Sequence, residues 1–355
     1  MSVFIIAEAG VNHNGDLATA YQLIDVAVAA GADAVKFQTF KAENLVTSAG
    51  AKAEYQKTDT NPDESQLAML KRLELKYEFH FQLLSYCQTK GIQFLSTAFD
   101  FESLDFLVHK LGVGRLKLPS GEITNGPFLL AHAQTGKEII LSTGMATLGE
   151  VEMALSVLAF GYLNSALPPS LAAFEQAYSS GSGQALLKQK VTLLHCTTEY
   201  PTPPAHVNLR AMDTLQQAFG LTVGYSDHST GLAIPIAAAA RGAMLIEKHF
   251  TLNRNLPGPD HKVSLEPDEL KAMVQGIREV EQALGLAHKC AGAVELENRQ
   301  VARKSLVAKT ALKQGDVLTE NNMAIKRPGT GISPMLYWSQ LGTASPKAYL
   351  ADELL

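Results

Sequence analysis

The sequence has few features of a secreted, membrane-spanning or nucleic-acid-binding protein. Its three cysteines are too few and too scattered for a disulfide framework or a four-ligand zinc site, which favours a reducing compartment. No stretch approaches the roughly 18 uninterrupted apolar residues that a membrane span needs. The formal net charge of -5 provides no basic surface for nucleic acid. The first residues lack a basic leader and reach Glu8 before an apolar signal core could form, so we expect a cytoplasmic protein without membrane or nucleic-acid partners.

Short apolar runs that alternate with helical patterns occupy most of the chain. The 355 residues, 46% hydrophobic and 18% charged, can bury a sizeable core and suffice for more than one domain. Such alternation is typical of parallel α/β folds. Over residues 1–285 it predicts a (β/α)8 TIM barrel, whose active site is built at the carboxyl ends of the strands. We expect strands near residues 3–8, 33–38, 92–97, 114–119, 138–143, 191–196, 221–226 and 243–249.

The pattern changes after the predicted barrel. Residues 286–300 have the composition of a linker, and residues 301–355 contain short strand-like pieces separated by turns, which predicts a small β-rich domain. Within the barrel pattern, residues 53–63 predict a long loop of the kind that often serves as a lid or substrate contact. Residues 165–184 predict an inserted surface excursion, to which we assign no chemistry.

Two histidines end neighbouring predicted strands. His228 follows one strand directly, and strand alternation turns Glu247 and His249 to one face and Lys248 to the other. Two neutral imidazoles near carboxylates and water suit a divalent ion such as Mn²⁺ or Mg²⁺ with open coordination positions. Either histidine could instead be a hydrogen-bonded structural residue, but two adjacent strand ends that each offer one favour the metal site.

Ammonium and hydroxyl groups also end the predicted strands, at Lys36, Thr97, Lys117, Ser120 and Ser226. Together they could surround a phosphate and a carboxylate with charge-assisted hydrogen bonds, which implies a small, multiply charged anionic substrate. A lysine is more usually a solvated rim charge, but in a barrel mouth an uncompensated buried ammonium would be costly.

Three carboxylates complete the candidate site: Glu8, Glu122 and Asp260. They could orient the hydroxyl groups of a polar substrate or move a proton. Each carboxylate alone could equally be a salt-bridge partner, so the three indicate an active site only if they lie close together in the fold.

Nine short motifs occur in order along the chain. They are IAEAGVNH (6–13), VKFQT (35–39), LKLPSGE (116–122), LSTGM (141–145), LHCT (194–197), YPTP (200–203), YSDH (225–228), EKHF (247–250) and PGPD (257–260). Together they resemble the motifs of the sialic acid synthases. The resemblance covers nearly the whole chain, and residues 326–331 are similar to the signature of the family's C-terminal antifreeze-like (SAF, β-clip) domain.

The resemblance implies a metal-dependent synthase that forms a carbon–carbon bond. The family condenses phosphoenolpyruvate with the open-chain aldehyde of an N-acylated mannosamine-type sugar, giving a nine-carbon 2-keto acid and phosphate. By resemblance, His228 and His249 would bind the metal. Phosphoenolpyruvate would contact Lys36, Thr97, Lys117, Ser120 and Ser226, and the sugar would contact Glu8, Glu122, Tyr200, Asp260 and Arg327.

The same resemblance implies a mechanism and an assembly. The metal would polarise the aldehyde oxygen, the enol methylene carbon would attack, and water would then add to the phosphate-bearing carbon, with Glu122 as our preferred base. Arg327 would reach the barrel of a partner subunit in a domain-swapped homodimer.

One departure from the family pattern bears on the sugar. N-acetylneuraminic acid synthases usually carry Asn where this chain has Thr198. This change, with Phe37 and Phe40 flanking Gln38, resembles the synthases for diacetyllegionaminic acid, whose sugar is 2,4-diacetamido-2,4,6-trideoxymannose. We therefore predict a pocket adapted to a less hydroxylated sugar. The alternatives are an N-acetylneuraminate synthase using N-acetylmannosamine, a different barrel enzyme such as an aldolase or a 3-deoxy keto acid phosphate synthase, and a non-catalytic sugar- or ice-binding protein.

Overall fold

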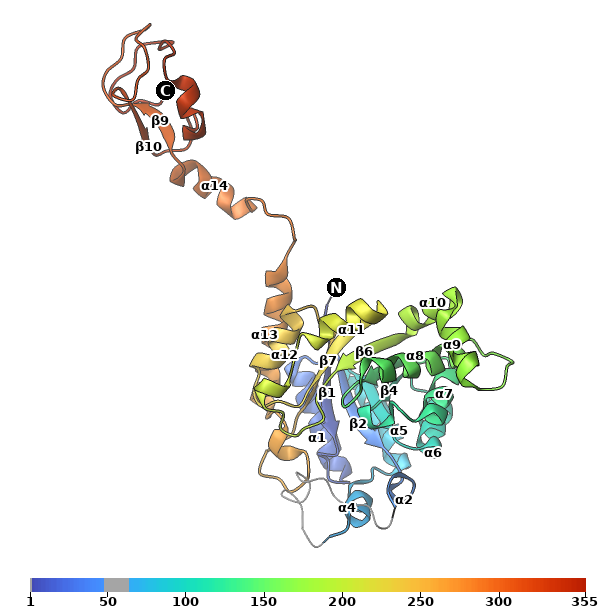
Figure 1. Cartoon of the computed structure of the whole chain (residues 1–355). Helices are drawn as coiled ribbons and strands as arrows, with labels where there is room; N and C mark the ends of the chain where they lie inside the picture. Colours follow the sequence, from blue (N-terminus) through green and yellow to red (C-terminus); the bar gives the residue numbers. More distant parts are fainter. Residues whose placement is uncertain (1, 48–63) are drawn as a thin grey trace. The chain divides into compact units, whose positions relative to one another are not determined.

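The chain divides into two compact units, Met1–Gly285 and Leu286–Leu355. The computed structural model describes residues 2–47 and 64–355 (Figure 1). The loop expected at residues 53–63 lies outside the described residues. Among the helices that the structure describes, none is both long enough and apolar enough to cross a bilayer.

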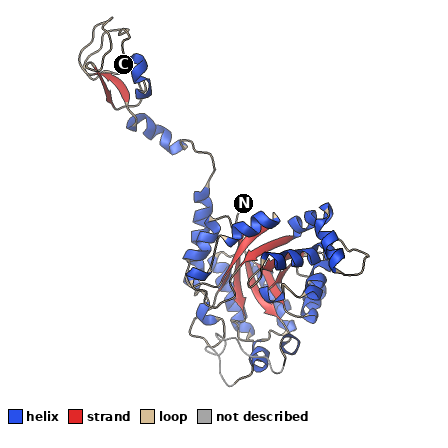
Figure 2. Cartoon of the chain, viewed as in Figure 1, coloured by secondary structure: helices blue, strands red, loops and turns tan. Residues whose placement is uncertain are grey.

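The first unit is a closed barrel of eight parallel strands, with its helices on the outside (Figure 2). Strands that are consecutive in the chain pair with each other, and the first closes the barrel by pairing with the last. The predicted barrel is confirmed, and each observed strand end lies within two residues of its predicted position. The strands are β1 Phe4–Gly10, β2 Ala34–Thr39, β3 Gln93–Ala98, β4 Arg115–Leu118, β5 Glu138–Ser142, β6 Val191–His195, β7 Thr222–Asp227 and β8 Leu245–His249.

Helices between the strands bury their apolar faces against the outward side chains of the barrel. The first helix shows how the sequence sets its ends. Asp16 accepts a hydrogen bond from the Thr19 N–H at the start, and Gly31 ends the helix in the left-handed region with φ of 80°. The helices are α1 Leu17–Ala30, α2 Ala42–Leu45, α4 Gln66–Leu73, α5 Tyr77–Lys90, α6 Phe101–Asp105, α7 Gly126–Gln134, α8 Leu148–Tyr162, α9 Leu171–Ser179, α10 Gly181–Lys190, α11 Ala211–Phe219, α12 Ala233–Ala240 and α13 Pro267–Leu284.

The inside of the barrel changes from apolar to polar along its strands. Six inward side chains near the amino-terminal end form a separate apolar cluster, which we call the apolar plug. Inward positions recur at every second residue, so the next inward side chain lies two positions further along each strand. These next side chains line a cavity above the plug. The steps from plug to cavity are Ile6 to Glu8, Ala34 to Lys36, Leu95 to Thr97, Ile140 to Ser142, Leu194 to Cys196, and Leu245 to Glu247.

The predicted surface excursion at residues 165–184 is partly helical. It contains α9 and residues 181–184 of α10, and both helices contact α8. Ala173 and Ala177 on α9 and Leu187 on α10 are buried. These helices therefore extend the outer layer of the barrel, away from the cavity-lining residues.

The second unit has its own small core. Its β9 Ser305–Ala308 and β10 Met323–Lys326 form a two-stranded antiparallel sheet. An exposed helix, α14 Ala293–Ala302, begins in the segment predicted as a linker and ends two residues after it. A short helix, α15 Tyr337–Gln340, lies near the end of the chain. The core consists of Ala308, Leu312, Leu318, Met323 and Tyr349.

Candidate active site

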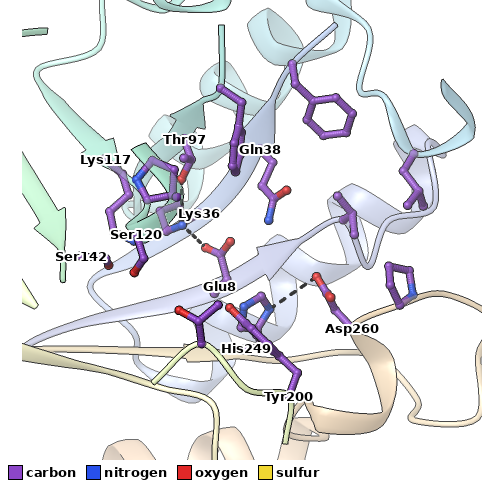
Figure 3. Close-up of a pocket in the computed structure, with 18 of the residues that line it drawn as sticks. Glu8, Lys36, Gln38, Thr97, Lys117, Ser120, Ser142, Tyr200, His249 and Asp260 are labelled. Carbon is purple, nitrogen blue, oxygen red and sulfur yellow. Dashed lines mark hydrogen bonds and ion pairs between the residues drawn. The ribbon is translucent and has the colours of Figure 1, made fainter. Parts of the chain in front are cut away.

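A cavity of about 360 Å³ lies at the carboxyl ends of the barrel strands (Figure 3). Most of the side chains predicted for the site line it, although they come from segments spread over the first unit. Ser142, Gln38 and Glu247 also line it and were not among the predicted site residues. The predicted residues that line the cavity are Glu8, Lys36, Thr97, Lys117, Ser120, Tyr200, Ser226, His228, His249 and Asp260.

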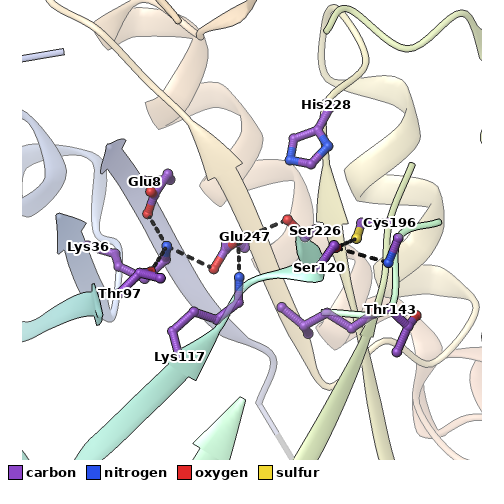
Figure 4. Close-up of polar contacts among 12 residues, drawn as sticks. Glu8, Lys36, Thr97, Lys117, Ser120, Thr143, Cys196, Ser226, His228 and Glu247 are labelled. Atoms are coloured by element: carbon purple, nitrogen blue, oxygen red, sulfur yellow. Dashed lines mark hydrogen bonds and ion pairs between the residues drawn. The ribbon is translucent and has the colours of Figure 1, made fainter. Parts of the chain in front are cut away.

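The base of the cavity is a buried ionic network, which we call the polar floor (Figure 4). Lys117 Nζ lies 3.1 Å from Glu247 Oε1, and Lys36 Nζ lies 3.6 Å from Glu247 Oε2. Lys36 Nζ also lies 2.7 Å from Glu8 Oε2. The floor consists of Glu8, Lys36, Thr97, Lys117, Ser226 and Glu247. Two lysines therefore share one carboxylate at the bottom of the cavity.

Hydroxyl groups complete the floor. Lys36 Nζ donates to Thr97 Oγ1 at 3.0 Å, and Ser226 Oγ donates to Glu247 Oε1 at 2.9 Å. The Ser142 hydroxyl is buried and has no hydrogen-bond partner among the described residues. Because an unpaired buried hydroxyl costs free energy, Ser142 is suited to bind a ligand oxygen.

The two carboxylates of the floor have opposite pKa shifts. Burial raises the pKa of Glu8 to about 7, against the opposing charge of Lys36 and with the help of Glu247. Burial acts in the same upward sense on Glu247, but the charges of Lys117 and Lys36 outweigh it and hold the pKa of Glu247 below its ordinary value. Near neutral pH, Glu247 is therefore ionised, whereas Glu8 can exchange a proton.

The two predicted histidines meet beside the floor, with ring centroids 5.8 Å apart. His228 Nδ1 lies 2.7 Å from the Thr197 carbonyl oxygen, which can only accept, so Nδ1 donates and Nε2 carries the lone pair. The Tyr200 hydroxyl, 2.9 Å from that Nε2, is its donor. His249 Nδ1 lies 3.9 Å from Asp260 Oδ2 and has no hydrogen-bond partner among the described residues.

Burial keeps both imidazoles neutral. It lowers the pKa of His228 to about 4, and it lowers the pKa of His249 well below the ordinary value. Neutral imidazole nitrogens are metal ligands, and the unpartnered Nδ1 of His249 fits that use. The Nε2 of His228 would bind an ion once the Tyr200 hydroxyl no longer donates to it. No group of three or more His, Cys, Asp and Glu side chains suited to a metal occurs in the described parts of the chain. An ion here would take two protein nitrogens and complete its coordination with water or substrate oxygens.

A second ionic pair lies on the outer side of the same two strands. Lys248 Nζ lies 2.6 Å from Asp227 Oδ2, and both side chains are fully buried. Asp227 Oδ1 also accepts from the backbone N–H and hydroxyl of Ser229. His228 and His249 each follow one member of this pair in sequence, so the pair fixes the strand ends that carry them.

One side of the cavity is apolar, and we call it the apolar wall. Its seven members form a hydrophobic cluster separate from the main core. They come from the residues that follow β1, β2 and β3, and from the short helices α2 and α4. The wall consists of Val11, Phe40, Leu45, Met69, Leu70, Leu73 and Phe99, all of which line the cavity.

The residues cited for sugar preference divide between the cavity and the core. Thr198 and Phe40 line the cavity. The interpretation of Phe37 was wrong: it is fully buried in the main core, where it stacks on Phe94 with ring centroids 5.7 Å apart. Lys36 faces inward, so strand alternation turns the next side chain outward.

Two predicted site residues do not line the cavity. Glu122 lies in a short turn after β4, where its Oε2 accepts from Asn125 Nδ2 at 2.6 Å. Its backbone neighbours Ser120 and Gly121 line the cavity, but its side chain does not. Arg327 belongs to the second unit, where its Nε donates to the Ala302 carbonyl oxygen at 3.0 Å.

Comparison with known proteins identifies relatives over almost the full length. Residues 23–289 match the NeuB family. The chain is 50% identical to an N,N'-diacetyllegionaminic acid synthase of Campylobacter jejuni over 99% of this chain and 98% of that protein. It is 46% identical to a synthase of the same name from Legionella pneumophila, over 94% of this chain and 88% of the relative. An N-acetylneuraminic acid synthetase structure from Leptospira borgpetersenii, in complex with citrate, matches with a TM-score of 0.67 at 34% identity, covering 84% of this chain and 90% of that one.

Proposed function

The chain belongs to the NeuB family, and on that premise we propose that it condenses phosphoenolpyruvate with 2,4-diacetamido-2,4,6-trideoxymannose. The products are N,N'-diacetyllegionaminate and phosphate. The observation that carries the proposal is the polar floor, where two lysines share Glu247 beside a pair of neutral imidazoles. The near full-length identity to two synthases for this product supports the choice of sugar.

Phosphoenolpyruvate would bind at the polar floor. Lys36 and Lys117 would supply positive charge, and the hydroxyls of Ser120 and Ser142 would donate to phosphate and carboxylate oxygens. Ser226, whose hydroxyl donates to Glu247, would contact the same anion. Thr97 would bind the same anion. Glu247, held ionised by the lysines, keeps both ammonium groups in place before the substrate arrives.

His228 and His249 would hold a divalent ion, Mn²⁺ or Mg²⁺, near this anion. When bound, the ion would supply Lewis acidity toward the aldehyde oxygen of the sugar. Tyr200 and Asp260 lie beside the two imidazoles and would orient the sugar together with Thr198. The Thr197 carbonyl oxygen fixes the tautomer of His228, and the Tyr200 hydroxyl lies at its Nε2.

Proton transfer is assigned to Glu8 in place of Glu122. The methylene carbon of the enol attacks the aldehyde carbon, and the aldehyde oxygen takes up a proton. Water then adds to the carbon that bears the phosphate and loses a proton. The carbon–oxygen bond to phosphate breaks as the remaining hydroxyl becomes the keto group, and the proton of that hydroxyl leaves with the phosphate. Glu8 lines the cavity with a pKa of about 7, so its acid form can supply the first proton and its carboxylate can accept the second.

Phosphate release tests the reaction. The enzyme with Mn²⁺ should release phosphate only when phosphoenolpyruvate and a suitable sugar are both present. We expect kcat/KM to be higher for the diacetamido trideoxy sugar than for N-acetylmannosamine. A preference for N-acetylmannosamine would move the assignment to N-acetylneuraminate synthesis, and phosphate release without any sugar would contradict the condensation.

The second unit would act as the family's antifreeze-like domain in a domain-swapped homodimer. Arg327 would then contact the sugar in the barrel of the partner subunit. A mixture of Arg327→Ala and His249→Ala chains should regain part of the activity that each lacks, because some mixed dimers contain one intact site. After subunit exchange verified by mass, the absence of any recovery would contradict the swap.

A further inference from the structure

The apolar wall differs from the rest of the hydrophobic interior because all its members line the cavity. Val11, Phe40, Met69 and Leu73 are buried, and three partly buried side chains pack against them. None of the seven side chains carries a nitrogen or oxygen atom that could bind a polar group. Apolar surface beside a polar cavity favours a ligand whose own apolar groups can cover it.

The wall and the floor lie at different depths. Lys36 and Glu247 lie within strands, one inward step above the apolar plug, and Lys117 lies within β4. Phe40 and Phe99 follow the ends of β2 and β3, and the remaining wall residues come from the β1–α1 loop and from α2 and α4. The wall is therefore nearer the mouth of the cavity than the anion-binding floor.

Resting on the proposed function, we infer that the apolar wall is the subsite for the methyl-bearing end of the sugar, its C6 methyl and its 4-acetamido methyl. The aldehyde carbon must meet phosphoenolpyruvate at the floor, so the opposite end of the sugar extends toward the mouth. A hydroxyl at C4 or C6, as in N-acetylmannosamine, would lose water against the wall without gaining a partner from it. The wall thus selects for deoxygenated and acylated sugars.

The helix α4 offers a matched pair of substitutions. Leu70 and Leu67 are both partly buried on this helix, but only Leu70 lines the cavity. Leu70→Asn places an amide against the subsite, whereas Leu67→Asn makes the same chemical change away from it. Leu45→Asn, on α2, tests the wall from a second element.

The measurement is kcat/KM for the diacetamido trideoxy sugar and for N-acetylmannosamine, at saturating phosphoenolpyruvate, with thermal unfolding as the check on folding. Leu70→Asn and Leu45→Asn should lower the ratio of the two values by about 10-fold or more, the range that a lost methyl-sized apolar contact gives in a specificity pocket. The KM for phosphoenolpyruvate should stay unchanged. Leu67→Asn should leave the ratio within about twofold of the wild type.

The outcomes separate the subsite from the proposed function. Equal losses for both sugars in Leu70→Asn, or the same change of ratio in Leu67→Asn, would overturn the subsite while the synthase activity stands. A wild-type enzyme that consumes neither sugar with phosphoenolpyruvate would overturn the proposed function, and the ligand assigned to the wall with it.

Discussion

The polar floor and the apolar wall face the same cavity but are built in different ways. The floor consists of charged and hydroxyl side chains on regular strands, and each is fixed by an ion pair or hydrogen bond. The wall consists of aliphatic and aromatic side chains from loops and short helices between β1 and β4. Under the proposed function, the reacting groups would depend on the rigid barrel, whereas the choice of sugar would depend on the segments added to it.

Removal of the divalent ion should have the largest effect. The two-imidazole site belongs to the polar side, so chelation should abolish phosphate release and added Mn²⁺ should restore it. Calorimetry should detect Mn²⁺ binding to the wild type and to Leu70→Asn, but no binding to His249→Ala. Full activity after exhaustive chelation would contradict the metal site.

Loss of one ammonium group from the floor should have the second-largest effect on activity. Lys36→Met leaves Glu8 and Glu247 without a shared cation, so we expect kcat/KM to fall by about 10²–10³-fold, as when one preorganised donor is removed. The preference between the two sugars should not change, because the wall is intact. Lys71→Met, which removes an exposed lysine on α4, is the control and should leave activity unaltered. A change of sugar preference in Lys36→Met would contradict the separate roles of the floor in anion binding and the wall in sugar selection.

The buried Lys248–Asp227 ion pair, next to the two histidines in sequence, should contribute to the stability of the fold. Lys248→Met leaves the Asp227 carboxylate buried without its cation, and we expect the free energy of unfolding to fall by about 3–5 kcal/mol in denaturant titration. Asp227→Asn combined with Lys248→Met should recover part of the loss, since no charge is then left unpaired. A loss below about 1 kcal/mol in the single variant would place this pair with the weak surface ion pairs.

The smallest expected effect is a change in the pH dependence of stability. The pKa of Glu8 is about 7 in the folded protein and near 4.5 when unfolded, so between these values the folded state holds the extra proton. The contribution of Glu8 to stability is therefore fully present below pH 4.5 and is lost as pH rises to 7. Glu8→Gln should remove this slope, and Leu70→Asn should keep it. Equal slopes in Glu8→Gln and wild type would contradict the raised pKa.

The barrel and the floor could be predicted because the sequence repeats one local rule. Each strand is a short apolar run, and the polar residue near its carboxyl end, such as Lys36 or Thr97, faces inward by alternation. Glu247 obeys the same rule and was missed as a site residue, although its inward position had been predicted. Phe37 was misread because the rule was not applied to it: Lys36 faces inward, so its neighbour must face the core.

The wall, Glu122 and α14 were beyond this rule. Residues of the β2–β3 crossover such as Leu45 and Met69 follow no strand alternation, so only tertiary packing shows that they meet Phe40 and Phe99. Glu122 lies in a turn after β4, where strand alternation no longer sets the direction of a side chain, and its carboxylate contacts Asn125. The helix α14 is exposed along its whole length, so no packed face distinguishes its segment from a linker.

The apolar plug makes the reaction chamber blind at its lower end. Six side chains fill the barrel beneath the floor, so traffic to the deepest position passes the outer one first. In the proposed reaction, the molecule at the closed end would have to bind before the molecule above it. Phosphoenolpyruvate would then bind first and the sugar second, and phosphate would leave only after the nine-carbon keto acid has dissociated.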